Sequence, residues 1–283
     1  MFWTLKRRAA ARHRPNLISV IDPIEHRASA ALTRNIFSNH VERFVNSPSK
    51  WIDIQTDEGT FSAYLALPRS GERSGPGIVL IQEIFGVNDH IREVAEHYAS
   101  DGYTVLAPDL FWRSEPRVSL GYSDADRTRA FALMKACDIA RAAGDVGLTA
   151  HALRSRIAPG ESVAAVGYCL GGRLAYQAAA AGAVDKAVAY YGGGIDSILD
   201  QAEHIRVPLL FHFGARDAHI PQTAVEAIRQ TFTGRPDVAV HVYENAEHGF
   251  NCPMRPAFHR HSAALARGRT LTFLETPQPA QAA

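Results

Sequence analysis

Residues 162–172 read Ser-Val-Ala-Ala-Val-Gly-Tyr-Cys-Leu-Gly-Gly, and they are the most informative segment of the sequence. A short apolar run leads into Gly-x-Cys-x-Gly, and an alanine-rich segment of helical character follows at 173–181. A strand, a sharp turn and a helix in this order are typical of a nucleophile elbow, here with a thiol instead of the commoner serine. Glycines two residues before and two after Cys169 leave room for a strained turn. The motif alone is equally compatible with a buried free cysteine beside a tight turn, so the rest of the chain must decide.

The composition is that of a folded protein with almost no net charge. The chain has 283 residues, 46% of them hydrophobic, which is enough for one large domain or two small ones. Its 30 basic and 29 acidic side chains nearly cancel, so we expect no nucleic-acid partner. No apolar run approaches the roughly 18 residues that a membrane span needs, so we expect no membrane association either.

The cysteines indicate a reducing environment. Cys137, Cys169 and Cys252 are few and odd in number, and they form no CxxC motif and no Cys/His pair with metal-ligand spacing. We therefore expect neither a disulfide framework nor a metal site. Free thiols fit a cytoplasmic location.

The apolar pattern from about residue 49 onward is typical of an α/β fold. Two alternating segments, 51–55 and 61–67, flank Asp-Glu-Gly at 57–59 and predict an antiparallel hairpin. Further apolar segments alternate with helical ones, which predicts a mostly parallel central sheet with helices on both faces. We expect strands near 77–82, 103–107, 162–168, 186–191, 207–213 and 238–243, and helices near 88–100, 125–136, 145–156, 173–181, 223–232 and 258–274.

We expect one catalytic domain at 49–275, flanked by two segments of different character. Residues 1–48 begin rich in arginine and poor in acids, but no apolar segment of a secretory signal follows. Their apolar residues are scattered without a period, which predicts a weakly ordered or partly helical extension. The Pro/Gln/Ala-rich residues 276–283 predict a flexible tail.

A nucleophile at an elbow needs a base and an acid that orients the base. In folds with such an elbow the acid and then the histidine follow the nucleophile along the chain. Asp217 and His248 each lie just past the carboxyl end of an expected strand, where parallel sheets gather their ligands. We therefore expect Cys169 as nucleophile, His248 as base and Asp217 as orienting acid. Taken alone, Asp217 could cap a turn and His248 could be an ordinary loop residue, and His219 is a competing base.

The loop after the strand at 77–82 is the expected source of an oxyanion hole. In α/β hydrolases this loop donates one backbone amide, and the residue after the nucleophile donates the other. We therefore expect the N–H groups of Ile84 and Leu170 to form the hole. Glu83 at the end of the strand is either a solvated charge or a carboxyl group aimed at the thiol.

Five short motifs together resemble the dienelactone hydrolase (carboxymethylenebutenolidase) family over about 51–273. The resemblance implies an α/β-hydrolase fold and a Cys–His–Asp triad that acts on lactones or related esters without metal or organic cofactor. It also implies that Glu83 contacts the thiol in the resting enzyme, until substrate binding releases it. The motifs are Gln-Glu-Ile-Phe-Gly-Val-Asn at 82–88, Ala-Pro-Asp-Leu at 107–110, Gly-Tyr-Cys-Leu-Gly-Gly at 167–172, Tyr-Tyr-Gly at 190–192 and Glu-His-Gly-Phe at 247–250.

The resemblance further implies two arginines that hold a substrate carboxylate, and here the chain departs from the family pattern. Arg127 falls at the first position, although its helical spacing also fits a solvated charge, and Phe131 stands where a tyrosine is expected. At the second position the chain has Cys252, and the next arginine is Arg255, while Gly249 replaces a serine. We expect Arg127, Phe131 and Gly249 to line the substrate site, with weaker bidentate recognition of a carboxylate.

The expected activity is hydrolysis of a small lactone or ester through a thioester on Cys169, by a monomeric enzyme. A thiol with an ordinary pKa of about 8.5 is easier to activate than a serine hydroxyl. One alternative is a general short-chain esterase or thioesterase. An alternative from another class is a non-catalytic thiol binder or redox sensor.

Overall fold

The computed structural model describes residues 49–68 and 75–277. The extension expected at 1–48 and nearly all of the tail expected at 276–283 lie outside the described residues.

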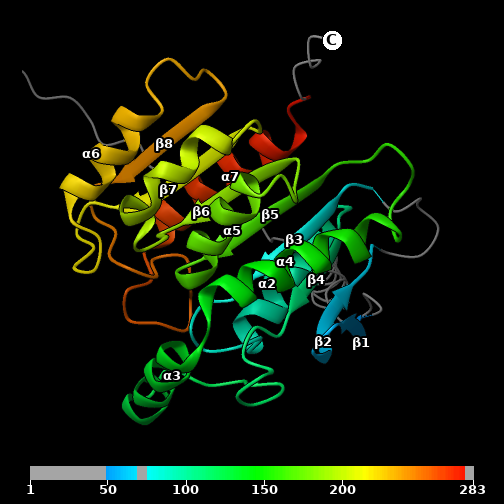
Figure 1. The fold of residues 1–283 in the computed structure, drawn as a ribbon. Coiled ribbons are helices and arrows are strands. Elements are labelled where there is room, and N and C mark those ends of the chain that lie inside the picture. Colours follow the sequence, from blue (N-terminus) through cyan, green and yellow to red (C-terminus); the bar gives the residue numbers. More distant parts are fainter. Residues whose placement is uncertain (1–48, 69–74, 278–283) are drawn as a thin grey trace, which may run out of the picture. The chain divides into compact units, whose positions relative to one another are not determined.

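An eight-stranded sheet forms the centre of this part of the chain (Figure 1). Its strand order is β1-β2-β4-β3-β5-β6-β7-β8. The first three strands in this order pair antiparallel, and every later neighbour pairs parallel. The predicted hairpin and the predicted mostly parallel sheet are both confirmed. The strands are β1 (Ser49–Thr56), β2 (Gly59–Ala66), β3 (Gly77–Ile81), β4 (Thr104–Pro108), β5 (Val163–Tyr168), β6 (Lys186–Tyr190), β7 (Leu209–Gly214) and β8 (Val238–Tyr243).

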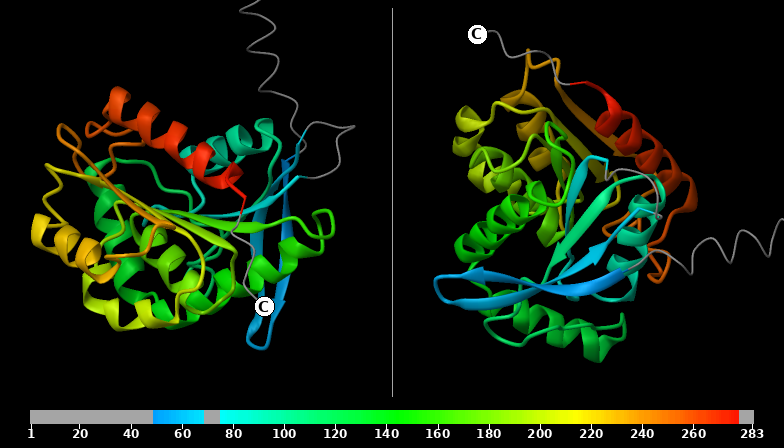
Figure 2. Two further views of the ribbon diagram at one scale, coloured as in Figure 1. Left: turned by 90° about the horizontal axis from the view of Figure 1, so that it is seen from above. Right: turned by 90° about the vertical axis from the view of Figure 1, so that its right-hand side faces the viewer.

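Helices cover both faces of the sheet, as the apolar strands require. In Figure 2, α2 and α7 lie on one face, and α4, α5 and α6 lie on the other. None of the described helices is long and apolar enough to cross a membrane. The helices are α2 (Asp89–Ser100), α3 (Asp124–Ala136), α4 (Ile139–Arg154), α5 (Leu170–Ala180), α6 (Gln222–Thr231), α7 (Arg260–Glu275) and the 3₁₀ segment η1 (Ile195–His204).

Helix α4 begins earlier than the sequence predicts, at Ile139 instead of near residue 145. The Asp138 side chain caps it by accepting hydrogen bonds from the N–H groups of Ala140 and Arg141, at 3.0 and 3.1 Å. Gly144 and Gly147 weaken the helical pattern near the middle of the segment, because glycine is a poor helix former. The side-chain cap and tertiary packing outweigh that weak propensity.

The parallel strands bring four chemically active side chains to one edge of the sheet. Glu83, Cys169 and Asp217 follow the carboxyl ends of β3, β5 and β7, and His248 follows β8. Because these strands are parallel, their carboxyl ends lie at the same edge, where ligands bind in open α/β sheets. The candidate site lies there.

Candidate active site

The turn between β5 and α5 holds Cys169 in a strained conformation. Its φ of 54° and ψ of −114° are rare for a residue with a side chain. A Cβ at Gly167 would lie 1.9 Å from the Gly171 carbonyl oxygen, and one at Gly171 would lie 2.3 Å from that of Ile81. Only glycine fits two such close approaches of backbone to backbone. The Cys169 N–H donates a hydrogen bond to Tyr190 O at 3.0 Å, which ties the strained residue to the end of β6.

The three residues predicted as a triad lie in one hydrogen-bonded chain. His248 Nε2 lies 3.1 Å from Cys169 Sγ, and His248 Nδ1 lies 2.8 Å from Asp217 Oδ2. Asp217 Oδ1 accepts the N–H groups of His219 and Ile220, at 2.8 and 3.2 Å. The competing His219 packs its ring 5.0 Å from that of His248, between centroids, so it is His248 whose ring nitrogen faces the thiol.

The surroundings of His248 favour its protonated form. Burial alone lowers the pKa of His248, because it removes the charged ring from water. The charge of Cys169 and the hydrogen bonds with Asp217 and Cys169 outweigh burial and raise the pKa to about 10. At neutral pH the ring then keeps a proton toward each of its two partners. Such an imidazolium is the neighbour that stabilises a thiolate.

The thiol opens into a pocket of about 560 Å³. Ile84 and Leu170, the expected oxyanion donors, both line it. The Leu170 amide is the first of α5, where an N–H has no partner within the helix and the helix dipole favours negative charge. The predicted Arg127 and Phe131 line the same pocket from α3, and Phe131 is 46% exposed.

Arg255 also belongs to this site, which was not predicted from the sequence. Its Nη1 donates to Glu83 Oε1 at 3.1 Å, and its side chain lines the pocket beside Cys169. Gly249 has a φ of 82°, and a Cβ there would lie 2.1 Å from Arg255 Nη1. Gly249 therefore makes room for the guanidinium and is not among the residues that line the pocket. The glycine at 249 and the arginine at 255 both depart from the family pattern, and together they could have predicted that Arg255 enters the site.

Glu83 is buried and contacts Arg255 instead of the thiol. Only one of its oxygens is used, because Oε2 has no hydrogen-bond partner. The sulfur of Cys169 faces His248. The contact between Glu83 and the thiol that the resemblance implied is therefore not formed in this structure.

The pocket is cationic. Arg127, Arg173 and Arg255 line it, and no acidic side chain is among its described lining residues. Arg127 forms an exposed ion pair with Asp124 on its own helix, and the buried Nε of Arg173 has no hydrogen-bond partner. This charge suits a substrate that carries a carboxylate.

The fold and the site are those of an α/β hydrolase. The sheet is mostly parallel, Cys169 lies at a nucleophile elbow, and Asp217 and His248 follow it in that order along the chain. The sequence model of the dienelactone hydrolase family matches residues 61–277. A carboxymethylenebutenolidase of Pseudomonas putida is 37% identical over 225 residues, which cover 79% of this chain and 94% of the relative. A carboxymethylenebutenolidase of Cupriavidus pinatubonensis is 32% identical over 217 residues, covering 76% of this chain and 92% of the relative.

Solved structures agree with the sequence relatives. A crystal structure from Klebsiella pneumoniae, provisionally named a dienelactone hydrolase, superposes with a TM-score of 0.71 at 28% identity, covering 82% of this chain and all of its own. The chain belongs to the dienelactone hydrolase family, and the resemblance read from its motifs is confirmed.

Proposed function

We propose that the protein hydrolyses a lactone or carboxylic ester by acyl transfer through Cys169. The observation that carries the proposal is the hydrogen-bonded chain from the Cys169 sulfur through His248 to Asp217, at the base of a pocket of about 560 Å³. The names of the relatives, carboxymethylenebutenolidases, support the same class of bond.

In the first half of the reaction the thiolate sulfur attacks the carbonyl carbon. The carbonyl electrons move onto oxygen, and the amides of Ile84 and Leu170 stabilise the resulting oxyanion. When this intermediate collapses, the carbon–oxygen bond of the ester or lactone breaks. His248 gives its proton to the leaving oxygen, and the acyl group remains on sulfur as a thioester.

In the second half His248 acts as the base. Its neutral ring takes a proton from water, whose oxygen attacks the thioester carbonyl. The carbon–sulfur bond then breaks, which releases the acid and restores the thiolate beside the imidazolium. Asp217 keeps the Nδ1 proton of His248 in place throughout, so that Nε2 faces the reacting atoms.

The arginines of the pocket support a substrate that carries its own carboxylate. The second candidate, a general short-chain esterase or thioesterase, is favoured by the apolar wall of Phe131, Met134 and Ile139 in the same pocket. The rates on p-nitrophenyl hemisuccinate and the neutral p-nitrophenyl butyrate separate the two. A preference for the anionic ester that is lost in Arg127→Ala supports the first, and equal rates on both esters support the second.

The triad is tested with p-nitrophenyl acetate and a panel of small lactones. We expect Cys169→Ala and His248→Ala each to lower kcat/KM by about three orders of magnitude or more. Cys137→Ala is the matched control, because the Cys137 sulfur lies 3.8 Å from the Leu110 carbonyl oxygen and does not line the pocket, so this variant should keep full activity. Activity that survives both triad substitutions would overturn the proposal. Fast alkylation of Cys169 without turnover of any substrate would point to a thiol binder instead.

We further propose that the enzyme works as a monomer in the cytoplasm. All three cysteines are free, which supports a reducing compartment. Cell fractionation and analytical ultracentrifugation test the two statements separately.

A further inference from the structure

Behind the wall of the substrate pocket, Glu83, His90 and Cys252 form a buried cluster. One carboxylate oxygen, one ring nitrogen and one sulfur all lie within 4.8 Å of one another. The three residues are 1%, 2% and 0% exposed. They come from the end of β3, the first turn of α2 and the loop after β8, so no spacing in the sequence reveals them.

Two atoms of this cluster lack the partners that buried polar atoms require. Glu83 Oε2 and His90 Nε2 are both buried, and neither has a hydrogen-bond partner. Buried polar atoms in proteins are almost always paired, so each exception needs an explanation. A single ligand between these two atoms and the Cys252 sulfur, which is hydrogen-bonded to the Tyr122 hydroxyl, would satisfy both unpartnered atoms.

We propose that Glu83, His90 and Cys252 bind a divalent transition-metal ion of the zinc class. Carboxylate, imidazole and thiolate are the three ligand types of protein zinc sites, and three protein ligands leave a fourth position for water. The sulfur and the ring nitrogen select against Mg²⁺ and Ca²⁺, which prefer oxygen. The carboxylate and the thiolate together balance the two charges of the ion.

The geometry requires only a small adjustment. Ligand atoms of a tetrahedral zinc site lie roughly 3.4–3.6 Å apart, so three atoms that all lie within 4.8 Å of one another need to draw together by no more than about 1.4 Å. Glu83 can bind the ion through Oε2 and keep its ion pair with Arg255 through Oε1. The Tyr122 hydroxyl beside Cys252 and the Asn88 amide that binds this hydroxyl add polar groups to the surroundings.

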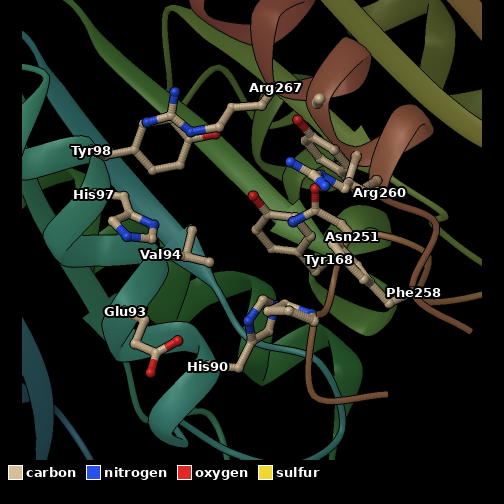
Figure 3. A pocket seen from close by; sticks show the side chains of 14 residues that line it. His90, Glu93, Val94, His97, Tyr98, Tyr168, Asn251, Phe258, Arg260 and Arg267 are labelled. Carbon is tan, nitrogen blue, oxygen red and sulfur yellow. The ribbon is translucent and has the colours of Figure 1, made fainter. Parts of the chain in front are cut away.

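A second pocket reaches His90, one of the three proposed ligands, and would be the entry path for the ion. It measures about 300 Å³, lies between α2 and α7, and is lined by His90, Glu93 and His97 on its α2 side. Figure 3 shows these three along α2, with Arg260 and Arg267 across the pocket. It shares no lining residue with the substrate pocket, so the ion reaches His90 without passing the thiol of Cys169.

The site differs from the proposed hydrolytic machinery but adjoins it. Glu83 directly precedes Ile84 in the chain and pairs with Arg255, which lines the substrate pocket. A bound ion would therefore fix the Glu83 carboxylate beside the substrate pocket. Metal binding is measured directly, so its failure leaves the hydrolase proposal untouched.

The test uses the full-length protein, freed of metal with a chelator and titrated with Co²⁺. This ion takes zinc sites and gives a thiolate-to-metal charge-transfer absorption. We expect one equivalent with this absorption in the wild type, in Cys137→Ala and in Cys169→Ala. The last variant excludes binding to the proposed triad. In Cys252→Ser we expect the absorption to vanish and the affinity for Zn²⁺ to fall by about a hundredfold or more.

Three results would overturn the proposal: a wild type without the absorption, a Cys252→Ser variant that keeps it, or a Cys169→Ala variant that loses it. The first would mean that no metal ion binds through the Cys252 sulfur. If Cys252→Ser does not fold, X-ray absorption spectra of Co²⁺-loaded Cys169→Ala decide. One sulfur with nitrogen and oxygen ligands is expected, and a shell without sulfur contradicts the site.

Discussion

Asp217 and Glu83 are two buried carboxylates that follow strands of the same sheet, yet their oxygens are used very differently. Asp217 Oδ2 pairs with His248, and Oδ1 accepts two backbone N–H groups. Glu83 Oε1 pairs with Arg255, and Oε2 has no partner. The loop after β7 therefore holds its carboxylate in one orientation, whereas the loop after β3 leaves capacity for a further ligand.

On the proposals above, Asp217 is a group that positions His248, and Glu83 is a group that binds a ligand. A carboxylate fixed by backbone amides can orient a histidine with little motion of its own. A carboxylate that is held only by a side chain can exchange partners when a ligand arrives. Substitutions that remove one charge at a time test the distinction.

The largest effect is expected from Asp217→Asn. The amide cannot hold the Nδ1 proton of His248, so the ring adopts the wrong tautomer and kcat falls by about three to four orders of magnitude. Glu83→Gln is the matched control, because it removes the charge and keeps the shape, and we expect a loss of about tenfold or less. Steady-state kinetics on the best ester measure both. Comparable losses of kcat in the two variants would contradict the proposed difference between Asp217 and Glu83.

The second effect concerns the pKa of His248, which NMR titration of its ring protons measures. The hydrogen bond and charge of Asp217 help to raise this pKa to about 10, whereas Glu83 is not among the main causes of the shift. Loss of an anionic neighbour favours the neutral ring, so Asp217→Asn should lower the pKa by about one to two units. Glu83→Gln should leave it unchanged.

The same titration predicts the pH dependence of the wild type. The imidazolium loses its proton as the pH rises through about 10, so kcat/KM should fall over that range. A rate that stays constant to pH 11 would contradict the assignment of His248.

The smallest effect is expected from Gly249→Ala, which acts on Glu83 through its partner. The new methyl group displaces Arg255, so kcat/KM on an anionic ester should fall a few-fold. Gly234→Ala is the matched control, because Gly234 has a similar φ of 84° and nothing within 4 Å of an added Cβ. Both variants should lose about 1 kcal/mol of unfolding free energy in denaturant titrations, from the left-handed backbone alone. Equal activity in both would show that Arg255 does not depend on Gly249.

The sequence predicted the sheet and the candidate triad because both follow from local patterns. Apolar runs mark the strands, and the order of Cys169, Asp217 and His248 along the chain follows from where parallel strands end. The same logic identified the loop that carries Glu83 and Ile84.

The partners of these residues could not be predicted in the same way. Arg255 lies in a loop after β8, and the path of this loop to Glu83 depends on tertiary packing. The need for glycine at position 249 becomes apparent only when the Arg255 guanidinium is seen to occupy the space of a Cβ. The cluster of Glu83, His90 and Cys252 joins three separate elements. Contacts between side chains from distant segments depend on angles and packing that no periodicity encodes.

The tight contact between the elbow and β3 has a mechanical consequence. The Gly171 N–H donates to Gln82 O at 3.1 Å, and its Cα leaves no space before the Ile81 carbonyl. The first turn of α5 is therefore hydrogen-bonded to and packed against the end of β3, the strand that precedes Ile84. We therefore expect the Cys169 sulfur and the Ile84 and Leu170 amides, the proposed nucleophile and oxyanion donors, to keep their relative positions. In the proposed mechanism the rate depends on this spacing, so small distortions of the sheet should leave the rate unchanged.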